Sequence, residues 1–170
     1  MIVWSFVGIP WVVPANLGMA NVLEKRNLLE IAHGRSRPPF SDEHIQKGET
    51  LQKKTYAKVQ NAEVQATLRE CFSDFAITTW AVVFGYSLAG TTELGVFKEH
   101  ETQLLLASAI AASGGTRQAK SHMKGALTLG VSLPAAQAVL RAAHQLNEWN
   151  HVEITEIDAE ELYREISQVL

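Results

Sequence analysis

Residues 113–132, SGGTRQAKSHMKGALTLGVS, decide the fold that the sequence predicts. Thr116 is a residue type that caps helices, and Gly130 stands where a left-handed residue often ends one. The segment between them carries a single histidine, His122, among small residues. On a helix of 3.6 residues per turn, this histidine shares a face with Ala119, Met123, Ala126 and Leu129. We therefore expect an inward-facing histidine on a core helix.

Helix signals continue on both sides of this segment. Ser132 caps a following helix that runs to about Trp149. The preceding segment, 97–113, is apolar all round over 104–112, so we expect a helix that is buried on every side. A last amphipathic helix is expected over 158–170. Strand signals are scarce throughout, and the predicted fold class is all-α.

The residues before position 97 predict three further helices. Segment 73–88 contains a β-branched run that is also typical of a strand, but its length favours a buried helix. Segment 21–33 reads as a helix closed by Gly34. Ser41 is expected to cap a polar helix that reaches about residue 59.

We expect one helical domain over 44–170, preceded by an N-terminal arm and a peripheral helix over 1–43. The chain has no charged residue before Glu24. A secretory signal begins with basic residues, and a spanning helix would have to include Pro10 and Pro14. The composition therefore favours an extended arm packed on the protein or on a neighbouring subunit. A targeting or membrane role is the open alternative.

The composition excludes several classes of partner and site. With 170 residues, 46% of them hydrophobic, the chain can bury one sizeable core. Its net charge of −3 provides no basic surface, so we expect neither nucleic acid nor a membrane as a partner. Cys71 is the only cysteine, which excludes an intrachain disulfide and fits a cytoplasmic protein. Its acidic and apolar neighbours predict a structural thiol.

The residues alone leave two roles open for His122. It is either a hydrogen-bonded core histidine or an acid/base beside a small cavity. His144 and Glu148 are spaced i, i+4, but no third ligand stands at a recognisable spacing, so we expect an exposed polar pair. We predict no metal site.

Residues 101–140, ETQLLLASAIAASGGTRQAKSHMKGALTLGVSLPAAQAVL, resemble the core of the carboxymuconolactone decarboxylase and alkylhydroperoxidase-D-like superfamily. The shared pattern is an apolar helix, a turn of small residues, a helix bearing His and then Gly-Ala, a glycine stop and a helix that begins after Ser. Residues 48–60, GETLQKKTYAKVQ, and the pair Phe84-Gly85 are similar to features of the decarboxylase branch. The likeness covers roughly residues 44–151.

The resemblance implies an all-α helical bundle of the alkylhydroperoxidase-D-like type that forms a homo-oligomer, either a trimer or a hexamer. It places the active site near the helix-borne histidine and a subunit interface. The peroxidatic branch has cysteines at the positions of Gly115 and Gln118, so thiol peroxidase activity is not expected. The decarboxylase branch uses no metal or organic cofactor. The resemblance thus implies a cofactor-free lyase or isomerase that acts on a small lactone or organic acid.

The resemblance also implies roles for individual residues. Loss of CO2 from a lactone acid leaves an electron-rich dienolate, which a histidine with a pKa near neutrality can protonate. His122 is the expected catalytic acid/base. The expected substrate-binding residues are Arg117 and Gln118, one turn upstream, and His100 and Gln103, at the start of the preceding helix.

A second function stays open at this point. The family usually has a basic residue before the apolar core helix and an acidic residue before the aromatic-Gly pair, and this chain has neither. The absence of these residues favours a non-catalytic oligomeric helical protein that binds a small apolar ligand or a protein partner.

Overall fold

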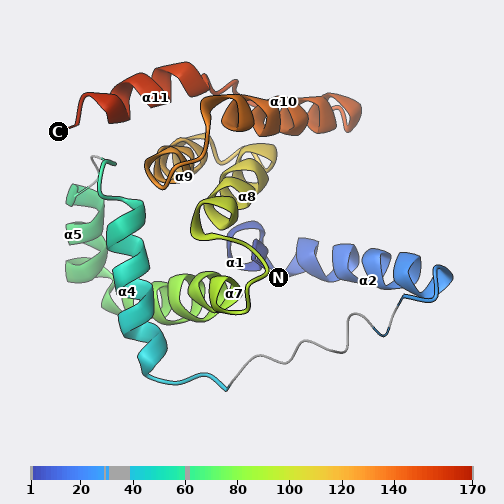
Figure 1. Cartoon of the computed structure of the whole chain (residues 1–170), viewed down its shortest axis with the longest axis horizontal. Helices are drawn as coiled ribbons and strands as arrows, with labels where there is room; N and C mark the ends of the chain where they lie inside the picture. Colours follow the sequence, from blue (N-terminus) through green and yellow to red (C-terminus); the bar gives the residue numbers. More distant parts are fainter. Residues whose placement is uncertain (1, 29, 31–38, 60–61, 170) are drawn as a thin grey trace.

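The computed structural model describes residues 2–28, 30, 39–59 and 62–169, and every regular element in these residues is a helix (Figure 1). The all-α prediction is confirmed for this part of the chain. The helices are α1 (Trp4–Val7), α2 (Ile9–Lys25), α4 (Glu43–Thr55), α5 (Ala62–Cys71), α6 (Ser73–Thr78), η1 (Thr79–Ala89), α7 (Gly90–Glu93), α8 (Glu99–Ala112), α9 (Thr116–Thr128), α10 (Leu133–Trp149) and α11 (Ala159–Ser167).

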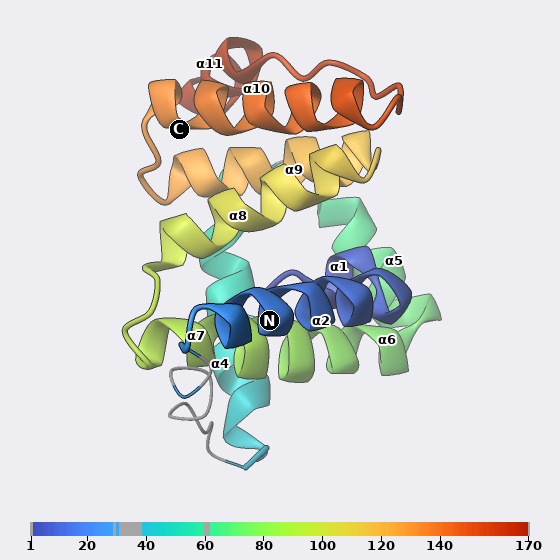
Figure 2. The same cartoon turned by 90° about the vertical axis from the view of Figure 1, so that its right-hand side faces the viewer.

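The helices pack in layers, which Figure 2 shows from the side. Helices α8 and α9 pair in the middle layer, and α10 and α11 cover them on one side. Below them, α4 crosses η1 and also reaches α9. The largest completely buried apolar side chains come from η1, α8, α9 and α11, and are Leu88, Leu106, Met123 and Leu162. A single core therefore joins the layers.

The β-branched segment is helical, as predicted, but its second half is a π-helix, η1. Two glycines bring η1 into backbone contact with α4. A Cβ atom on Gly48 would lie 1.8 Å from the Trp80 carbonyl oxygen, and one on Gly85 would lie 1.9 Å from the His44 carbonyl oxygen. Only residues without a side chain fit this crossing.

The helices around His122 begin and end close to their predicted bounds. Helix α9 starts at Thr116, with Gly115 rather than Thr116 as its N-cap. Gly130 follows it in the left-handed region, with φ of 103°. Ser132 caps α10 and accepts a hydrogen bond from the Ala135 amide at 3.4 Å. These local signals worked because each lies on the chain segment that it controls.

One burial prediction is wrong. The apolar run of α8 is not buried on every side, because Leu105 faces away from the helices that α8 packs against and is 39% exposed. Cys71 lies at the end of α5 and is exposed, and its expected role as a structural rather than a nucleophilic thiol stays a prediction.

The prediction of an extended N-terminal arm is also wrong, because the arm is helical. Gly8, with φ of 87°, separates α1 from α2. Pro10 fits the first turn of α2, where its missing N–H costs no intrahelical bond. Pro14 lies inside the helix, and the apolar residues around it continue the helix past this interruption.

Helix α2 ends at Lys25, so the predicted helix 21–33 has the wrong start, and its predicted end at Gly34 lies outside the described residues. The helix predicted after Ser41 is α4, whose N-cap is Asp42 and whose last residue is Thr55. Across the described residues, no single helix is long and apolar enough to cross a membrane. One pair of helical segments, Glu63–Cys71 and Ser73–Glu93, meets these criteria together by length and composition only, and the two segments are bent by 114° relative to each other.

Candidate functional site

His122 lies where the two halves of the bundle meet. It projects from α9, and its ring contacts residues from three other segments of the chain. These are Tyr56, directly after α4, Gln103 in the first half of α8, and Phe6 in α1. The residue is only 4% exposed. The predicted inward orientation is therefore confirmed.

Both ring nitrogens of His122 are hydrogen-bonded. Nδ1–H donates to Oε1 of Gln103 at 3.1 Å, and Nε2 accepts from the hydroxyl of Tyr56 at 3.2 Å. This pairing puts the ring proton on Nδ1 and leaves the lone pair of Nε2 facing Tyr56. Phe6 meets the imidazole edge-on, with ring centroids 5.1 Å apart and an interplanar angle of 89°. The imidazole is thus held in position from three sides.

Burial sets the protonation state of this site. Desolvation lowers the pKa of His122 from 6.5 to about 4, because a charged imidazolium loses its hydration inside the protein. Burial also raises the pKa of the Tyr56 hydroxyl, so the phenol keeps its proton and stays a donor. The expectation of a near-neutral histidine pKa does not match this environment. At pH 7 the imidazole is neutral.

On the segments that hold His122, two buried polar atoms have no hydrogen-bond partner among the described residues. One is Nε2 of Gln103, whose amide oxygen holds the imidazole, and the other is the hydroxyl of Thr55, next to Tyr56. An unpaired buried donor is costly and is also available to a ligand. Gly125 allows α4 and α9 to approach each other closely at Thr55, because a Cβ atom on Gly125 would lie 2.6 Å from the Thr55 methyl group.

The structure brings one of the four predicted substrate-binding residues to His122. Gln103 is completely buried and touches the ring. Arg117 and Gln118 are exposed at the start of α9, and His100 is half-buried in the first turn of α8. The described residues show no polar contact between His122 and any of these three.

The sequence analysis missed Tyr56 and Phe6 as neighbours of the histidine. Tyr56 had a usable signal, because it continues the buried stripe formed by Gly48, Leu51, Gln52 and Thr55 on α4. Phe6 had none, since nothing in an uncharged apolar segment shows which of its side chains packs on which distant residue.

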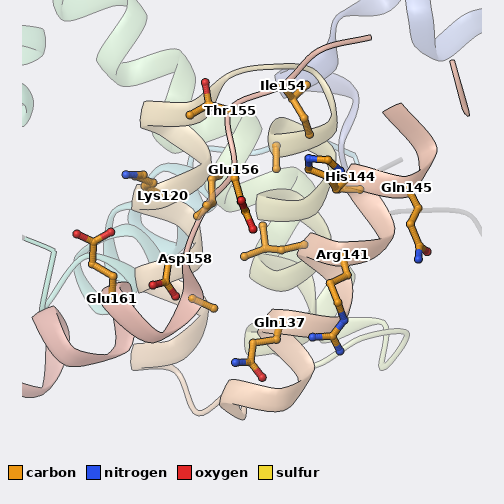
Figure 3. Close-up of a pocket in the computed structure, with 15 residues that line it drawn as sticks. Lys120, Gln137, Arg141, His144, Gln145, Ile154, Thr155, Glu156, Asp158 and Glu161 are labelled. Carbon is orange, nitrogen blue, oxygen red and sulfur yellow. The ribbon is translucent and has the colours of Figure 1, made fainter. Parts of the chain in front are cut away.

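A surface pocket of about 730 Å³ lies elsewhere, between α9, α10, α11 and the segment before α11 (Figure 3). Lys120, Arg141, Glu156 and Glu161 are among its charged lining residues. A second pocket, of about 500 Å³, lies beside α4 and α7. His122 lines neither of these pockets.

The described residues contain no group of three or more His, Cys, Asp or Glu side chains that could hold a metal ion. His144 instead pairs with Glu148 across one helical turn, at 3.4 Å. No family model, curated protein or solved structure matches this chain. The geometry and the sequence therefore carry the functional argument.

Acidification should reveal the buried imidazole. Above pH 6.5 the ring is neutral in both the folded and the unfolded chain. Between pH 6.5 and about 4 only the unfolded chain binds the proton, so the free energy of unfolding falls as the pH falls. We expect His122 to account for a loss of about 3 kcal/mol over this range. Urea titrations of the wild type and of His122→Gln at pH 7 and pH 4 measure it, and equal losses in both proteins would contradict it.

Proposed function

We propose that this chain is a cofactor-free lyase or isomerase that acts on a small lactone or organic acid, with His122 as its acid/base. The observation that carries the proposal is the pair of hydrogen bonds that hold the imidazole between the Tyr56 hydroxyl and the Gln103 amide. The resemblance of residues 101–140 to carboxymuconolactone decarboxylases supports the choice of substrate class.

The proposed proton path starts at Tyr56, which is more exposed than His122 and is therefore the group that a substrate meets first. A proton removed from the carbon beside a substrate carbonyl passes to the Tyr56 oxygen while the Tyr56 proton moves to Nε2 of His122. The imidazolium then returns a proton by the same path to a different carbon, which completes an isomerisation. The unpaired Nε2–H donors of Gln103 are suited to stabilise the intermediate enolate oxygen.

A decarboxylation uses this path once, towards the substrate. The bond between the carboxylate and its carbon breaks, CO2 leaves, and the electron pair stays on the dienolate. The dienolate then takes the proton that Tyr56 and His122 supply. Water afterwards returns a proton to this pair of side chains. A substrate carboxylate beside the ring would raise the pKa of His122, which allows the imidazole to carry that proton beforehand.

Substrate entry requires a movement of α1, because Phe6 covers the imidazole. Helix α1 has four residues and is joined to α2 through Gly8. Apart from α2, the helix on which α1 mainly packs is α8. Trp4 of α1 also donates a hydrogen bond to the Ser87 hydroxyl in η1 at 3.1 Å, so the proposed movement has to break this bond as well as the contact of Phe6.

We also propose that the protein acts in the cytoplasm as a homo-oligomer, a trimer or hexamer, without nucleic acid or membrane partners. The net charge of −3 and the single cysteine support this setting. The fold supports an oligomer through the apolar side chains that it leaves exposed.

The direct test is proton transfer to carbon in D2O. A panel of small unsaturated lactone acids is incubated with the protein and followed by NMR, with saturated analogues as controls. We expect deuterium at the carbon that gains the proton. For an isomerised substrate, kcat/KM should rise with pH through about 4 and then stay level to pH 8, because the active form is the neutral imidazole. The absence of exchange across the panel would contradict the proposal.

A non-catalytic oligomeric protein that binds a small apolar ligand or a protein partner is the second candidate. Its support is specific: both nitrogens of the imidazole already have partners, and neither pocket described above reaches the ring. This candidate predicts ligand binding without deuterium exchange, and binding that survives in His122→Gln.

A further inference from the structure

The larger of the two pockets described above, about 730 Å³ in volume, plays no part in the chemistry proposed at His122 (Figure 3). We call it the α10–α11 pocket. Its floor is apolar and belongs to the core: Ala111, Ala143 and Ile157 are buried there, and Leu140 packs against the same core. Because the bundle holds these side chains, the floor keeps its shape without a ligand.

One wall of the pocket is the segment between α10 and α11, and this segment is held at both ends. At its start, the Val152 amide donates to the Asn147 carbonyl oxygen at 2.8 Å. At its end, Asp158 is the N-cap of α11 and accepts a hydrogen bond from the Glu160 amide at 2.8 Å. The wall is therefore formed before any ligand arrives, as is usual for small-molecule sites.

Charges of both signs line the pocket without pairing with one another. Figure 3 shows Glu156 in the middle of the pocket, with Arg141 of α10 to one side and Glu161 of α11 to the other. Lys120 of α9 is half-buried at the edge. None of these four side chains has a hydrogen bond or an ion pair with another described residue. Their charged groups are therefore available to a ligand.

The balance of these charges narrows the class of ligand. The carboxylates of Glu156, Asp158 and Glu161 would repel a polyanion such as a nucleotide. Lys120 and Arg141 would repel a ligand that carries only positive charge. A wholly apolar ligand would cover the charged groups without giving them partners. A ligand that carries one charge of each sign avoids all three costs.

From these observations we propose that the α10–α11 pocket binds a short peptide of two or three residues with a free ammonium and a free carboxylate. The peptide carboxylate pairs with Arg141, whose guanidinium can donate two parallel hydrogen bonds. The ammonium pairs with Glu156, and apolar peptide side chains lie on the floor formed by Leu140, Ala143 and Ile157. Sites of roughly 300–1,000 Å³ hold ligands of this size. The site is independent of the function proposed for His122.

Blocked peptides test the recognition of each charge. Isothermal titration calorimetry compares the dipeptide Leu-Leu with acetyl-Leu-Leu, which lacks the ammonium, and with Leu-Leu amide, which lacks the carboxylate. We expect each block to weaken binding about 10-fold or more, as the loss of a charged hydrogen bond does. Equal binding of blocked and free peptides, no binding at millimolar concentration, or binding of free leucine as tight as that of Leu-Leu would overturn the assignment.

Two substitutions place the peptide in this pocket. Glu156→Gln should weaken Leu-Leu about 10-fold and leave acetyl-Leu-Leu unchanged, whereas Arg141→Gln should weaken Leu-Leu and leave Leu-Leu amide unchanged. Both side chains are exposed, so the variants should fold as the wild type does. Glu153→Gln and Arg117→Gln are the matched controls, since these exposed residues do not line the pocket. Controls that weaken Leu-Leu as much as the pocket variants would overturn the proposal.

Discussion

Gly85→Ala is expected to lower the free energy of unfolding by about 4 kcal/mol or more. The added Cβ atom would lie 1.9 Å from the His44 carbonyl oxygen, and its other near neighbour is the Trp80 carbonyl oxygen at 3.0 Å. Both obstacles are backbone atoms, which cannot rotate away as a side chain can. The α4–η1 crossing must therefore open, and it is the most extensive helix contact in the described chain. Domains of this kind have only about 5–15 kcal/mol of stability to lose.

Gly18→Ala is the matched control for this substitution. Gly18 is also inside a helix, but a Cβ atom there meets nothing within 4 Å. Its effect should stay within about 1 kcal/mol, in the stabilising direction that helix propensity gives. Urea denaturation followed by circular dichroism compares the two proteins. If Gly85→Ala is as stable as Gly18→Ala, the close crossing of α4 and η1 does not exist in solution.

The sequence predicted the helices after residue 97 better than those before it. The ends of α9 and α10 follow from Gly130 and Ser132, which act on their own helix ends. The prediction of an extended N-terminal arm failed because it took the two prolines as signs of an extended chain. Instead, Pro10 lies in the first turn of α2, and Pro14 removes the backbone donor of a single residue inside that helix. The sequence predicted a helix at η1 but not its π-helical geometry, which is rare in proteins.

The candidate site was predictable only in its centre. Helical periodicity predicted the inward face of His122, and the family resemblance implied a substrate-binding role for Gln103. The third partner, Tyr56, comes from 66 residues earlier in the chain, and no periodicity links positions so far apart. The low pKa of the imidazole also follows from burial by several segments, so it could not be foreseen from one helix.

The substitutions of His122 should have the largest effect on turnover. If the imidazole carries the proton, His122→Ala and His122→Gln should lower kcat by about 10²–10⁴, the usual contribution of a positioned acid/base. Glutamine is the more informative replacement, because it fills most of the space and can keep one of the hydrogen bonds to Tyr56 and Gln103. It cannot accept and return a proton near neutral pH. Turnover at the wild-type rate in a folded His122→Gln protein would remove the catalytic role.

Tyr56→Phe separates the proton path from the packing around it. Phenylalanine keeps the ring that contacts His122 at 5.7 Å between centroids but removes the hydroxyl that bonds to Nε2 at 3.2 Å. If the proton passes through that hydroxyl, kcat should fall by a similar factor of about 10² or more while the protein stays folded. His144→Gln is the control, since the polar partner of His144 among the described residues is Glu148, on the surface of α10. A Tyr56→Phe enzyme with unchanged kcat would mean that the substrate exchanges its proton with the imidazole directly, and that Phe6 and Tyr56 both move aside to admit it.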